Sequence, residues 1–358
     1  MKIKDIEFRK LRISLKETFK VAFSEIDYSD NVLLMITTDG GITGYGEAAP
    51  IAFVTGETVE SVVAVLEMLR PCLIGLNPLA IDQIHSTIDS TIHGNSSARC
   101  AIDLALFDIR GKVMGKPVYQ VLGGGSGIIQ NDMTIGINEP EEMARKARHY
   151  ALSEGYRILK VKAGIDPLSD VRALRLIRES VGPDIRLRVD ANQGYSVSDA
   201  ISILEPLREI GVEAIEQCLP YWDLEGAAYV RSKARGIKLM LDESIHDPKD
   251  AARACKLRAA DAFNIKLMKC GGLYPAEQIS AIAAANGITC MVGCMLETRL
   301  AITAGLSLVA AKSNVTDADC DSFTYADEAE VGVTGGFTYD GDMFRLSDEP
   351  GFGVKVDF

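Results

Sequence analysis

The sequence is poor in aromatic residues, basic residues and long apolar runs. One tryptophan and four histidines occur in 358 residues, and 38 lysines and arginines face 50 aspartates and glutamates, which gives a formal net charge of -12. This shortage of positive charge excludes general attraction to nucleic acid, since no basic stripe compensates the repulsion from phosphate. It does not exclude a small anionic substrate, because local lysines or a metal ion reverse the field inside one pocket.

Membrane-spanning segments and export signals are also missing. No apolar run reaches the length needed to span a bilayer. The first residues, MKIKDIEFRKLRI, alternate charged with apolar residues and lack the continuous apolar stretch of a signal peptide. We therefore expect a cytoplasmic protein without a membrane partner. The eight cysteines are scattered, apart from Cys290 and Cys294, so we expect reduced, buried thiols.

What the sequence does contain is a repeat of charged residues at the ends of short apolar runs. Lys162, Asp190, Glu216, Asp242 and Lys266 follow one another at intervals of 28, 26, 26 and 24 residues. Each interval is the length of one strand plus one helix. The runs RILKVK, IRLRVD, VEAIE, IKLMLD and AFNIK have strand character, and the segments between them have helical periodicity. Repeated βαβ units therefore predict a parallel sheet.

The alternation continues for eight units between residues 125 and 324. NDMTIGI precedes the runs named above as a first strand, and GITCMVG and SNVTDADCDS follow as a seventh and an eighth. The pattern predicts an α/β fold, a (β/α) barrel of modified TIM type. In such barrels the carboxyl ends of the strands converge on one mouth, where the active site lies.

The regions on either side of the barrel have another pattern. Residues 1–124 begin with strand-like runs, with a polar loop expected around Thr18 to Asp30 and a hairpin turn at Asp39-Gly40-Gly41. From Glu57 the apolar period becomes helical, which predicts an α+β domain. Residues 325–358 are rich in glycine and strand-like, and we expect this C-terminal tail to pack on the N-terminal region to complete a capping domain.

Three of the repeated residues are acidic and would lie side by side at successive strand ends. Repulsion among Asp190, Glu216 and Asp242 would raise their pKa values unless a cation lies between them. Ligation by oxygen alone, with room left for water and substrate, suits Mg²⁺. Asn192 and Glu243 are candidates for a second layer that orients these ligands. The alternative, three unrelated surface acids, does not account for the spacing.

Three lysines complete the repeat. Lys160 and Lys162 are two residues apart on one strand, so both point to the barrel interior, where each ammonium is expected to lower the pKa of the other. Lys266 lies four strands further on, half of the ring away. A substrate carboxylate bound to the metal would expose its α-carbon to one base on each face. One lysine would remove the α-proton, the other would return a proton, and the metal would stabilise the enediolate.

Further acids follow the last two strands. Asp319 and Asp321 lie on one face of the eighth strand and suit a cationic group of the substrate, such as an α-ammonium; the alternative is a solvated acidic turn. Glu297, after the seventh strand, is a weaker candidate for contact with the substrate or with the residues that surround it.

These residues together resemble the enolase superfamily, in particular its muconate-lactonizing subgroup. The resemblance covers nearly the whole chain through the motifs LKVKAG, VDANQGY, IEQ, LDES, NIKLMKCGG and the two aspartates after the eighth strand. Within the subgroup the chain is similar to the dipeptide epimerases, typified by L-Ala-D/L-Glu epimerase. The aspartate pair distinguishes this group, because in those enzymes it holds the N-terminal ammonium of the dipeptide.

The resemblance implies a role for each residue. Asp190, Glu216 and Asp242 become Mg²⁺ ligands, Lys162 and Lys266 the acid/base catalysts, and Lys160 the electrostatic partner of Lys162. Loops of the capping domain would choose the substrate side chain, here about Thr18 to Ile26, with Phe19 and Ser24, and about Ile51 to Glu57. Ser24 replaces an arginine that Ala-Glu epimerases tend to carry for the glutamate side chain, and Lys16, Lys20 or Arg299 would be substitutes.

The function that follows is a Mg²⁺-dependent epimerase of dipeptides, with L-Ala-D/L-Glu from murein peptides as the expected substrate and a homo-oligomer as the expected assembly. Alternatives in the same superfamily are o-succinylbenzoate synthase, N-acylamino acid racemase and a muconate-type cycloisomerase. The aspartate pair disfavours all three, because an acylated amine brings no cation and a dianionic substrate would be repelled. An alternative from another class is a non-catalytic sensor of amino acids or dipeptides, which needs no base on each face.

Overall fold

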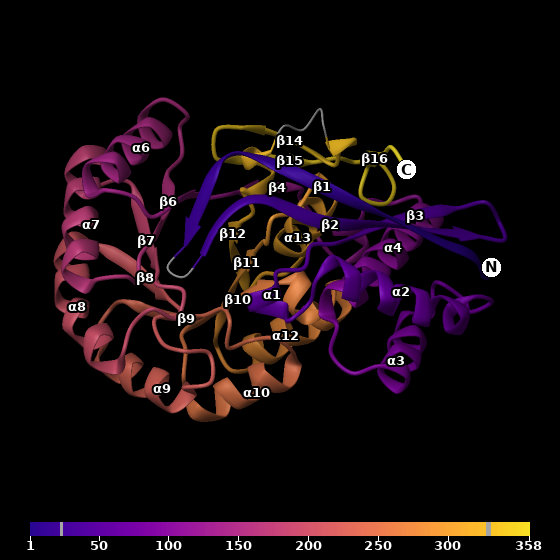
Figure 1. Ribbon diagram of the computed structural model, residues 1–358, viewed down its shortest axis with the longest axis horizontal. Helices are drawn as coiled ribbons and strands as arrows, with labels where there is room; N and C mark the ends of the chain where they lie inside the picture. The colour runs from indigo at the N-terminus through magenta and orange to yellow at the C-terminus, as the bar shows by residue number, and fades with distance from the viewer. Residues whose placement is uncertain (22–23, 327–330) are drawn as a thin grey trace.

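The computed structural model describes residues 1–21, 24–326 and 331–358, without the side chains at positions 17, 19–21, 24 and 25. Figure 1 shows a ring of helices around a parallel sheet, with the N-terminal hairpin reaching across it from a smaller group of strands and helices. The N-terminal antiparallel sheet consists of β1 (Ile3–Val21), β2 (Ser24–Thr38) and β3 (Thr43–Ala48). The predicted turn at residues 39–41 joins β2 to β3.

The expected polar loop from Thr18 to Asp30 is wrong, because β1 and β2 stay paired along most of this stretch. Its polar side chains are partners across the two strands. The Arg12 guanidinium donates two hydrogen bonds of 2.6 Å to Asp30, and the Thr18 hydroxyl donates one of 2.6 Å to Asp27. Pairs of this kind on facing strands stabilise a hairpin, although their composition is that of a loop.

Helices cover this sheet, and the central one packs against it very closely. They are α1 (Ala52–Thr55), α2 (Val59–Leu73), α3 (Ile81–Thr91), α4 (Ser96–Met114) and α5 (Val118–Val121). A Cβ on Gly46 of β3 would lie 1.8 Å from the Ala101 carbonyl oxygen of α4, and one on Gly44 would lie 2.2 Å from that of Ala105. Glycine at these two positions therefore permits the contact between α4 and β3.

Eight parallel strands form the barrel, as the repeat predicts. They are β5 (Met133–Ile135), β6 (Ile158–Lys162), β7 (Arg186–Asp190), β8 (Val212–Glu216), β9 (Lys238–Leu241), β10 (Ala262–Lys266), β11 (Thr289–Gly293) and β12 (Val315–Asp319). The order in the sheet follows the sequence. A parallel bridge between Asn131 and Ala318 brings the first and last strands together and closes the ring.

An outer layer of helices surrounds these strands (Figure 1). It contains α6 (Pro140–Leu152), α7 (Pro167–Val181), α8 (Val197–Ile210), α9 (Leu224–Lys233), α10 (Pro248–Leu257), α11 (Leu267–Cys270), α12 (Leu273–Ala285) and α13 (Arg299–Ala311). Side chains cap several of their first turns; Asp166 accepts from the Ser169 amide, and Ser196 forms a reciprocal pair with Asp199. These local signals begin each helix shortly after the strand end that carries a site residue.

The chain after β12 leaves the βα pattern. A 3₁₀ turn, Ser322–Tyr325, follows, and the tail then forms β13 (Val333–Gly335), β14 (Phe337–Asp340), β15 (Met343–Leu346) and β16 (Val354–Val356). β15 also pairs with β4 (Ile128–Gln130), which precedes the barrel. The Phe352 amide donates to Asp108 of α4 at 2.9 Å, so the tail contacts the N-terminal region. The division at residues 124 and 324 stays a prediction.

Buried carboxylates join the N-terminal region to the barrel. Glu47 of β3 accepts hydrogen bonds from the amide and hydroxyl of Thr298, at 2.9 and 2.6 Å, at the start of α13. Asp103 of α4 accepts from the Leu273 amide at the start of α12 and from His85. Because helix N-termini offer free N–H groups, each carboxylate fixes one barrel helix to the capping elements.

The structure can be compared with two expectations from the composition, which concern the cysteines and membrane-spanning segments. All eight cysteines are free, but Cys72 of α2 is exposed, against the expectation of buried thiols, because it lies on the outer side of an amphipathic helix. No helix in the described ranges combines the length and the apolar character that crossing a membrane requires.

Candidate active site

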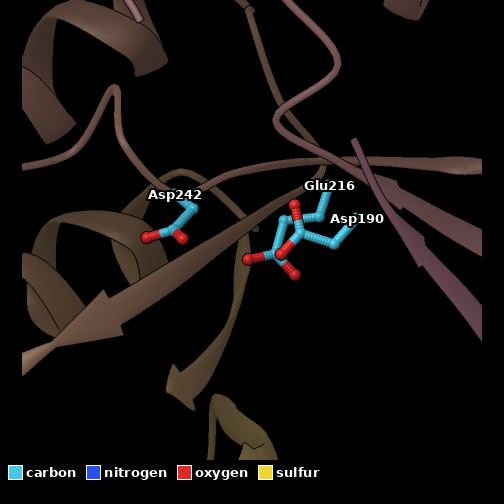
Figure 2. Close-up of side chains that lie close together, drawn as sticks. All are labelled: Asp190, Glu216 and Asp242. Atoms are coloured by element: carbon cyan, nitrogen blue, oxygen red, sulfur yellow. The ribbon is translucent and has the colours of Figure 1, made fainter. Parts of the chain in front are cut away.

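The three repeated acids meet at the mouth of the barrel. Asp190 and Glu216 end β7 and β8, and Asp242 directly follows β9, so neighbouring strands carry them to one edge. All three are buried, and one carboxylate oxygen of each lies within 4.8 Å of the others (Figure 2). The sequence repeat therefore brings together the acids that it singles out.

Lys160 lies among these carboxylates. Its Nζ is 3.0 Å from Asp190, 2.9 Å from Glu216 and 2.7 Å from Asp319. Burial disfavours the charged amine, but the surrounding carboxylates outweigh that effect and raise the pKa of Lys160. The expected lowering by a neighbouring lysine is thus wrong for Lys160, because its carboxylate neighbours are more numerous. It is a fixed positive charge at the centre of the site.

Lys162 and Lys266 approach from opposite sides. Their strands, β6 and β10, are four places apart in the sheet of eight. The Lys162 ammonium donates to Asp190 at 2.7 Å and to Asn192 at 3.0 Å, and Lys266 Nζ lies 2.9 Å from Asp242. Both line the same cavity. An atom held between them would have one amine on each face.

The pKa values of the three acids are shifted in different directions. Burial raises the pKa of Glu216 to about 8, and the negative charge of Asp190 adds to this effect. Burial acts on Asp190 in the same direction, but Lys160 and Lys162 outweigh it and lower its pKa to about 2. Lys266 and Lys269 likewise lower the pKa of Asp242. Without a cation, Asp190 and Asp242 are therefore ionised and balanced by lysines, whereas Glu216 keeps its proton at neutral pH.

Polar residues behind the acids hold them in place. The Asn192 amide N–H donates to Asp190 at 2.9 Å, and its side chain donates to Glu243 at 3.2 Å, so both residues of the predicted second layer contact the site. Asn192 has a φ of 40°, and Gln217 one of 33°, a conformation that non-glycine residues rarely adopt. Gln217 accepts from the Asp242 amide at 2.9 Å. Unusual backbone geometry thus occurs shortly after two of the acids.

Two residues near the acids escaped the sequence prediction. The Asn264 side chain donates to Glu216 at 2.7 Å; it lies two residues before Lys266 on β10, so strand alternation could have identified it. Lys269 Nζ lies 2.5 Å from Asp242 Oδ1 and donates to the Asn264 carbonyl at 3.2 Å. Lys269 lies on the single-turn helix α11, where alternation gives no signal.

The aspartate pair at the end of β12 borders the cavity next to Lys160. Asp321 accepts hydrogen bonds from the Thr134 amide at 2.7 Å and from the Tyr325 hydroxyl at 2.9 Å. Asp319 accepts from the Thr134 hydroxyl at 3.3 Å and contacts Lys160. The two carboxylates, Thr134 and Tyr325 all line the cavity. The two aspartates predicted from the sequence thus lie on one wall, together with Thr134 and Tyr325, which the sequence did not single out.

Apolar side chains of the capping elements cover this cavity of about 80 Å³. Ile26 comes from the start of β2, and Ile51, Phe53 and Val54 come from α1 and the residue before it. The predicted specificity residues Phe19 and Ser24 contribute backbone to the β1–β2 hairpin, but their side chains lie outside the described part of the structure.

Other residues expected at this wall have different neighbours. Arg299 donates to the Gly335 carbonyl at 2.8 Å and stacks 3.9 Å above the Phe337 ring, so it binds the tail and does not replace the missing arginine. Lys16 donates to the Thr324 carbonyl at 3.1 Å. Glu297 is buried and accepts from the Met295 amide at 2.9 Å; burial raises its pKa to about 8.

Comparison with known protein families matches both parts of the chain. Residues 5–123 match the N-terminal domain of mandelate racemase/muconate lactonizing enzyme, and residues 142–358 match the enolase C-terminal domain-like family. The chain belongs to the mandelate racemase/muconate lactonizing enzyme family of the enolase superfamily. This family assignment agrees with the motifs in the sequence.

Members of this family resemble the chain over its full length. An L-Ala-D/L-Glu epimerase of Clostridium acetobutylicum is 39% identical over 99% of both chains. An N-succinyl-L-Arg/Lys racemase of Bacillus cereus is 36% identical over 99% of this chain and 96% of its own. The structure of a dipeptide epimerase from Enterococcus faecalis, complexed with Mg and L-Leu-L-Tyr, superposes with a TM-score of 0.96 at 39% identity, covering 99% of this chain and 100% of that one.

The acidic residues of this family member have the properties of a divalent-cation site. The donor set consists of buried carboxylate oxygens, which Mg²⁺ prefers. Oδ2 of Asp242 and Oε2 of Glu243 are buried yet accept no hydrogen bond from the described residues. Buried acceptors normally have partners. A cation held by Asp190, Glu216 and Asp242 would give Oδ2 of Asp242 a second partner besides its ion pair with Lys266.

Proposed function

We propose that this chain is a Mg²⁺-dependent epimerase of dipeptides that inverts the α-carbon of the C-terminal residue. The observation that carries the proposal is the opposition of Lys162 and Lys266 across one cavity, four strands apart in the barrel. Inversion needs a base on one face of the carbon and an acid on the other. Two amines held on opposite walls supply both roles, and they exchange roles when the reaction reverses.

The remaining site residues hold the substrate in the proposed orientation. Asp190, Glu216 and Asp242 would hold Mg²⁺, which when bound would stabilise the negative charge that develops on the substrate carboxylate. Lys160 is a permanent cation beside the same acids and adds to that stabilisation. Asp319 and Asp321, on the adjoining wall, would bind the N-terminal ammonium. The α-carbon would then lie between Lys162 and Lys266.

The aspartate pair argues against the alternatives. An N-acylamino acid or o-succinylbenzoate precursor has no cationic amine for Asp319 and Asp321, and the second carboxylate of a muconate would be repelled by them. A sensor of dipeptides would need the residues that bind the substrate, but it would have no use for two lysines on opposite faces of the α-carbon. The related N-succinyl-amino acid racemase nevertheless makes N-succinyl substrates the necessary control in any assay.

For the C-terminal residue we propose glutamate first, as in the L-Ala-D/L-Glu epimerase that resembles this chain. A second candidate is an apolar residue, because Ile26, Ile51, Phe53 and Val54 cover the cavity from the capping side. A buried carboxylate side chain against these groups would have no cation from them. Murein peptides as the source of the substrate, a cytoplasmic location and a homo-oligomeric assembly belong to the same proposal.

A dipeptide library tests the function and separates the two candidates. The purified chain with Mg²⁺ is incubated with L-Ala-L-Glu, L-Ala-L-Leu, L-Ala-L-Phe and N-succinyl-L-arginine, and chiral chromatography follows the α-carbon. We expect epimerisation of the free-amine dipeptides and none of the acylated compound. Turnover of N-succinyl-L-arginine alone would contradict the assignment of Asp319 and Asp321. The ratio of kcat/KM for the glutamate and leucine dipeptides decides between the polar and the apolar candidate.

A further inference from the structure

Lys269 is a fully enclosed cation with no access to the cavity. Its side chain has no exposed surface, and its ammonium donates to the main-chain carbonyls of Asp242 and Asn264 as well as to Asp242 Oδ1, 2.5 Å away. Three acceptors are as many as an ammonium has protons. Lys269 is therefore held firmly against one oxygen of Asp242.

The other site lysines differ in their access. Lys160, Lys162 and Lys266 all line the cavity, whereas Lys269 is not among its described lining residues. Lys266 Nζ lies 2.9 Å from Oδ2 of Asp242 and its side chain lines the cavity. The two lysines thus divide the Asp242 carboxylate, with the enclosed Lys269 on Oδ1 and the cavity-lining Lys266 on Oδ2.

We infer that Lys269 is a positioning residue that reserves Oδ1 of Asp242, so that this carboxylate offers a single oxygen, Oδ2, to a divalent cation and the site favours Mg²⁺ over Ca²⁺. The inference rests on the proposed Mg²⁺ site. It adds a selectivity function for a residue that touches neither the cavity nor the substrate. Oδ2, by contrast, has only the ion pair with Lys266, whose side chain lines the cavity, so the enclosed Lys269 leaves this oxygen to the cavity side.

The physical reason is the difference between the coordination shells of the two ions. Mg²⁺ requires an octahedron of oxygens at about 2.0–2.1 Å, which single oxygens from several groups provide. Ca²⁺ takes six to eight oxygens at about 2.3–2.6 Å and gains from a carboxylate that binds through both oxygens. An ammonium on Oδ1 blocks the second oxygen. Its removal would let Asp242 bind through both, which benefits the larger ion.

Isothermal titration of the full chain, freed of metal, measures this selectivity directly. Wild type and Lys269→Met are each titrated with MgCl₂ and with CaCl₂. We expect the ratio of the two Kd values to shift toward Ca²⁺ by ~10-fold in Lys269→Met. A purely structural role would weaken both ions alike, so a ratio within about two-fold of wild type overturns the inference.

Lys112→Met is the matched control. Lys112 also binds an aspartate and a carbonyl, Asp108 at 2.7 Å and Thr43 at 2.8 Å, but it lies in the capping helix α4. Its replacement should leave the ratio unchanged, and a shift equal to that of Lys269→Met overturns the inference. Circular dichroism establishes that each variant is folded at the titration temperature.

A crystal structure of the wild type grown with Mg²⁺ tests the same point if Lys269→Met does not fold. We expect Asp242 to bind the ion through one oxygen, with Lys269 on the other. Asp242 binding through both oxygens, or Lys269 turned away from it, overturns the inference. A wild type that binds neither ion contradicts the proposed function as well, whereas Mg²⁺ binding with an unchanged ratio in Lys269→Met contradicts only the role of Lys269.

Discussion

At the scale of single residues, the four buried lysines of the site differ in what each amine contacts. Lys160 lies among three carboxylates, which raise its pKa and keep it charged. Lys269 is enclosed against Asp242. Lys160 also lines the cavity, but it shares β6 with Lys162, whereas Lys162 and Lys266 lie on opposite sides of the ring. Only these two have the positions that acid/base exchange at a substrate carbon needs.

Replacing either opposed lysine should greatly slow inversion but leave exchange of the α-proton on one face of the carbon. In Lys266→Ala we expect epimerisation to fall by about 10²–10⁴-fold, because the acid/base group on one face is gone. Lys162 should still exchange the α-proton of one stereoisomer with deuterium from D₂O. NMR of the α-proton, recorded separately for the L,L and L,D dipeptides, measures this exchange.

Lys162→Ala is the matched variant and should retain exchange of the opposite stereoisomer. If both variants lose exchange of the same stereoisomer, the two lysines do not act on opposite faces. A dipeptide sensor would show no exchange in the wild type either. Thermal unfolding of each variant establishes that the lost activity does not come from a lost fold.

The candidate site residues that the sequence indicated in the barrel share one property: they lie in a strand or shortly after its end. Lys162, Asp190 and Glu216 were found because a strand end recurs at a regular interval. Lys269 and Tyr325 were not found, because a one-turn helix and a 3₁₀ turn leave no periodic pattern. Thr134 lies in a predicted strand, but a hydroxyl residue there carries no chemical signal without its partner Asp321.

At the scale of elements, the close contact between β3 and α4 depends on glycines in β3, which have no side chain. We expect Gly46→Ala to destabilise the protein by about 1–3 kcal/mol, because a Cβ would overlap the Ala101 carbonyl oxygen and push the helix from the sheet. Urea unfolding followed by circular dichroism measures the loss. Gly40→Ala is the control, because the nearest atom to a Cβ there is 3.9 Å away. Equal stability of both variants would contradict the close packing.

The stability that the contact between β3 and α13 contributes should depend on pH, because Glu47 lies at this contact. Burial raises the pKa of Glu47, although hydrogen bonds from Thr298 and Asn31 oppose that effect. A carboxyl whose pKa is higher in the folded state contributes stability at low pH, and this contribution is lost as the pH rises through the raised pKa. The Tm advantage of wild type over Glu47→Gln should therefore shrink as the pH rises from about 4 to about 8.

Differential scanning calorimetry of wild type and Glu47→Gln over that pH range measures the trend. Glu67→Gln serves as the control, because Glu67 is exposed on α2 and its replacement should leave the pH profile of Tm unchanged. An advantage of Glu47 that grows with pH would mean that its hydrogen bonds outweigh its burial.

Most elements of the barrel could be predicted, and the errors have a common cause. The runs at β6 to β10 alternate so regularly that their ends were placed within a residue or two. The loop expected from Thr18 to Asp30 is instead part of a hairpin, because Arg12 and Asp30 pair across two strands. Composition describes each residue by itself, whereas cross-strand pairs depend on residues that are distant in the sequence. The same limit hides β4, which pairs with the tail.

At the scale of the whole molecule, buried carboxylates join the capping elements to the barrel. The proposed cation site lies on the barrel side of the cavity, and apolar side chains of the capping elements lie on the other side. Ile26, Ile51, Phe53 and Val54 lie over a cavity whose other walls include three lysines, Glu243 and the aspartate pair. The substrate would therefore be enclosed by both parts. Enclosure removes water, which strengthens every charge interaction in the site.

Mg²⁺ should stabilise the folded molecule, because the three acids converge only when β7, β8 and β9 are in place. At a concentration of 100 times its Kd, an ion that binds the folded state alone adds ~2.7 kcal/mol. We expect Tm to rise with MgCl₂ and to fall again with a chelator. Asp242→Asn should remove most of this rise, whereas Asp261→Asn, at the opposite end of the strands, should keep it. A Tm independent of Mg²⁺ in the wild type would contradict the site.

The central claim is that one lysine acts on each face of the α-carbon, and the early isotope content of substrate and product tests it most directly. The wild type is incubated in D₂O with Mg²⁺ and one stereoisomer of an active dipeptide, and both stereoisomers are separated after a few per cent conversion. Two opposed bases predict deuterium at the α-carbon of the product, with the recovered substrate still almost unlabelled. Equal labelling of both from the first turnovers, as a single base would give, would contradict the account.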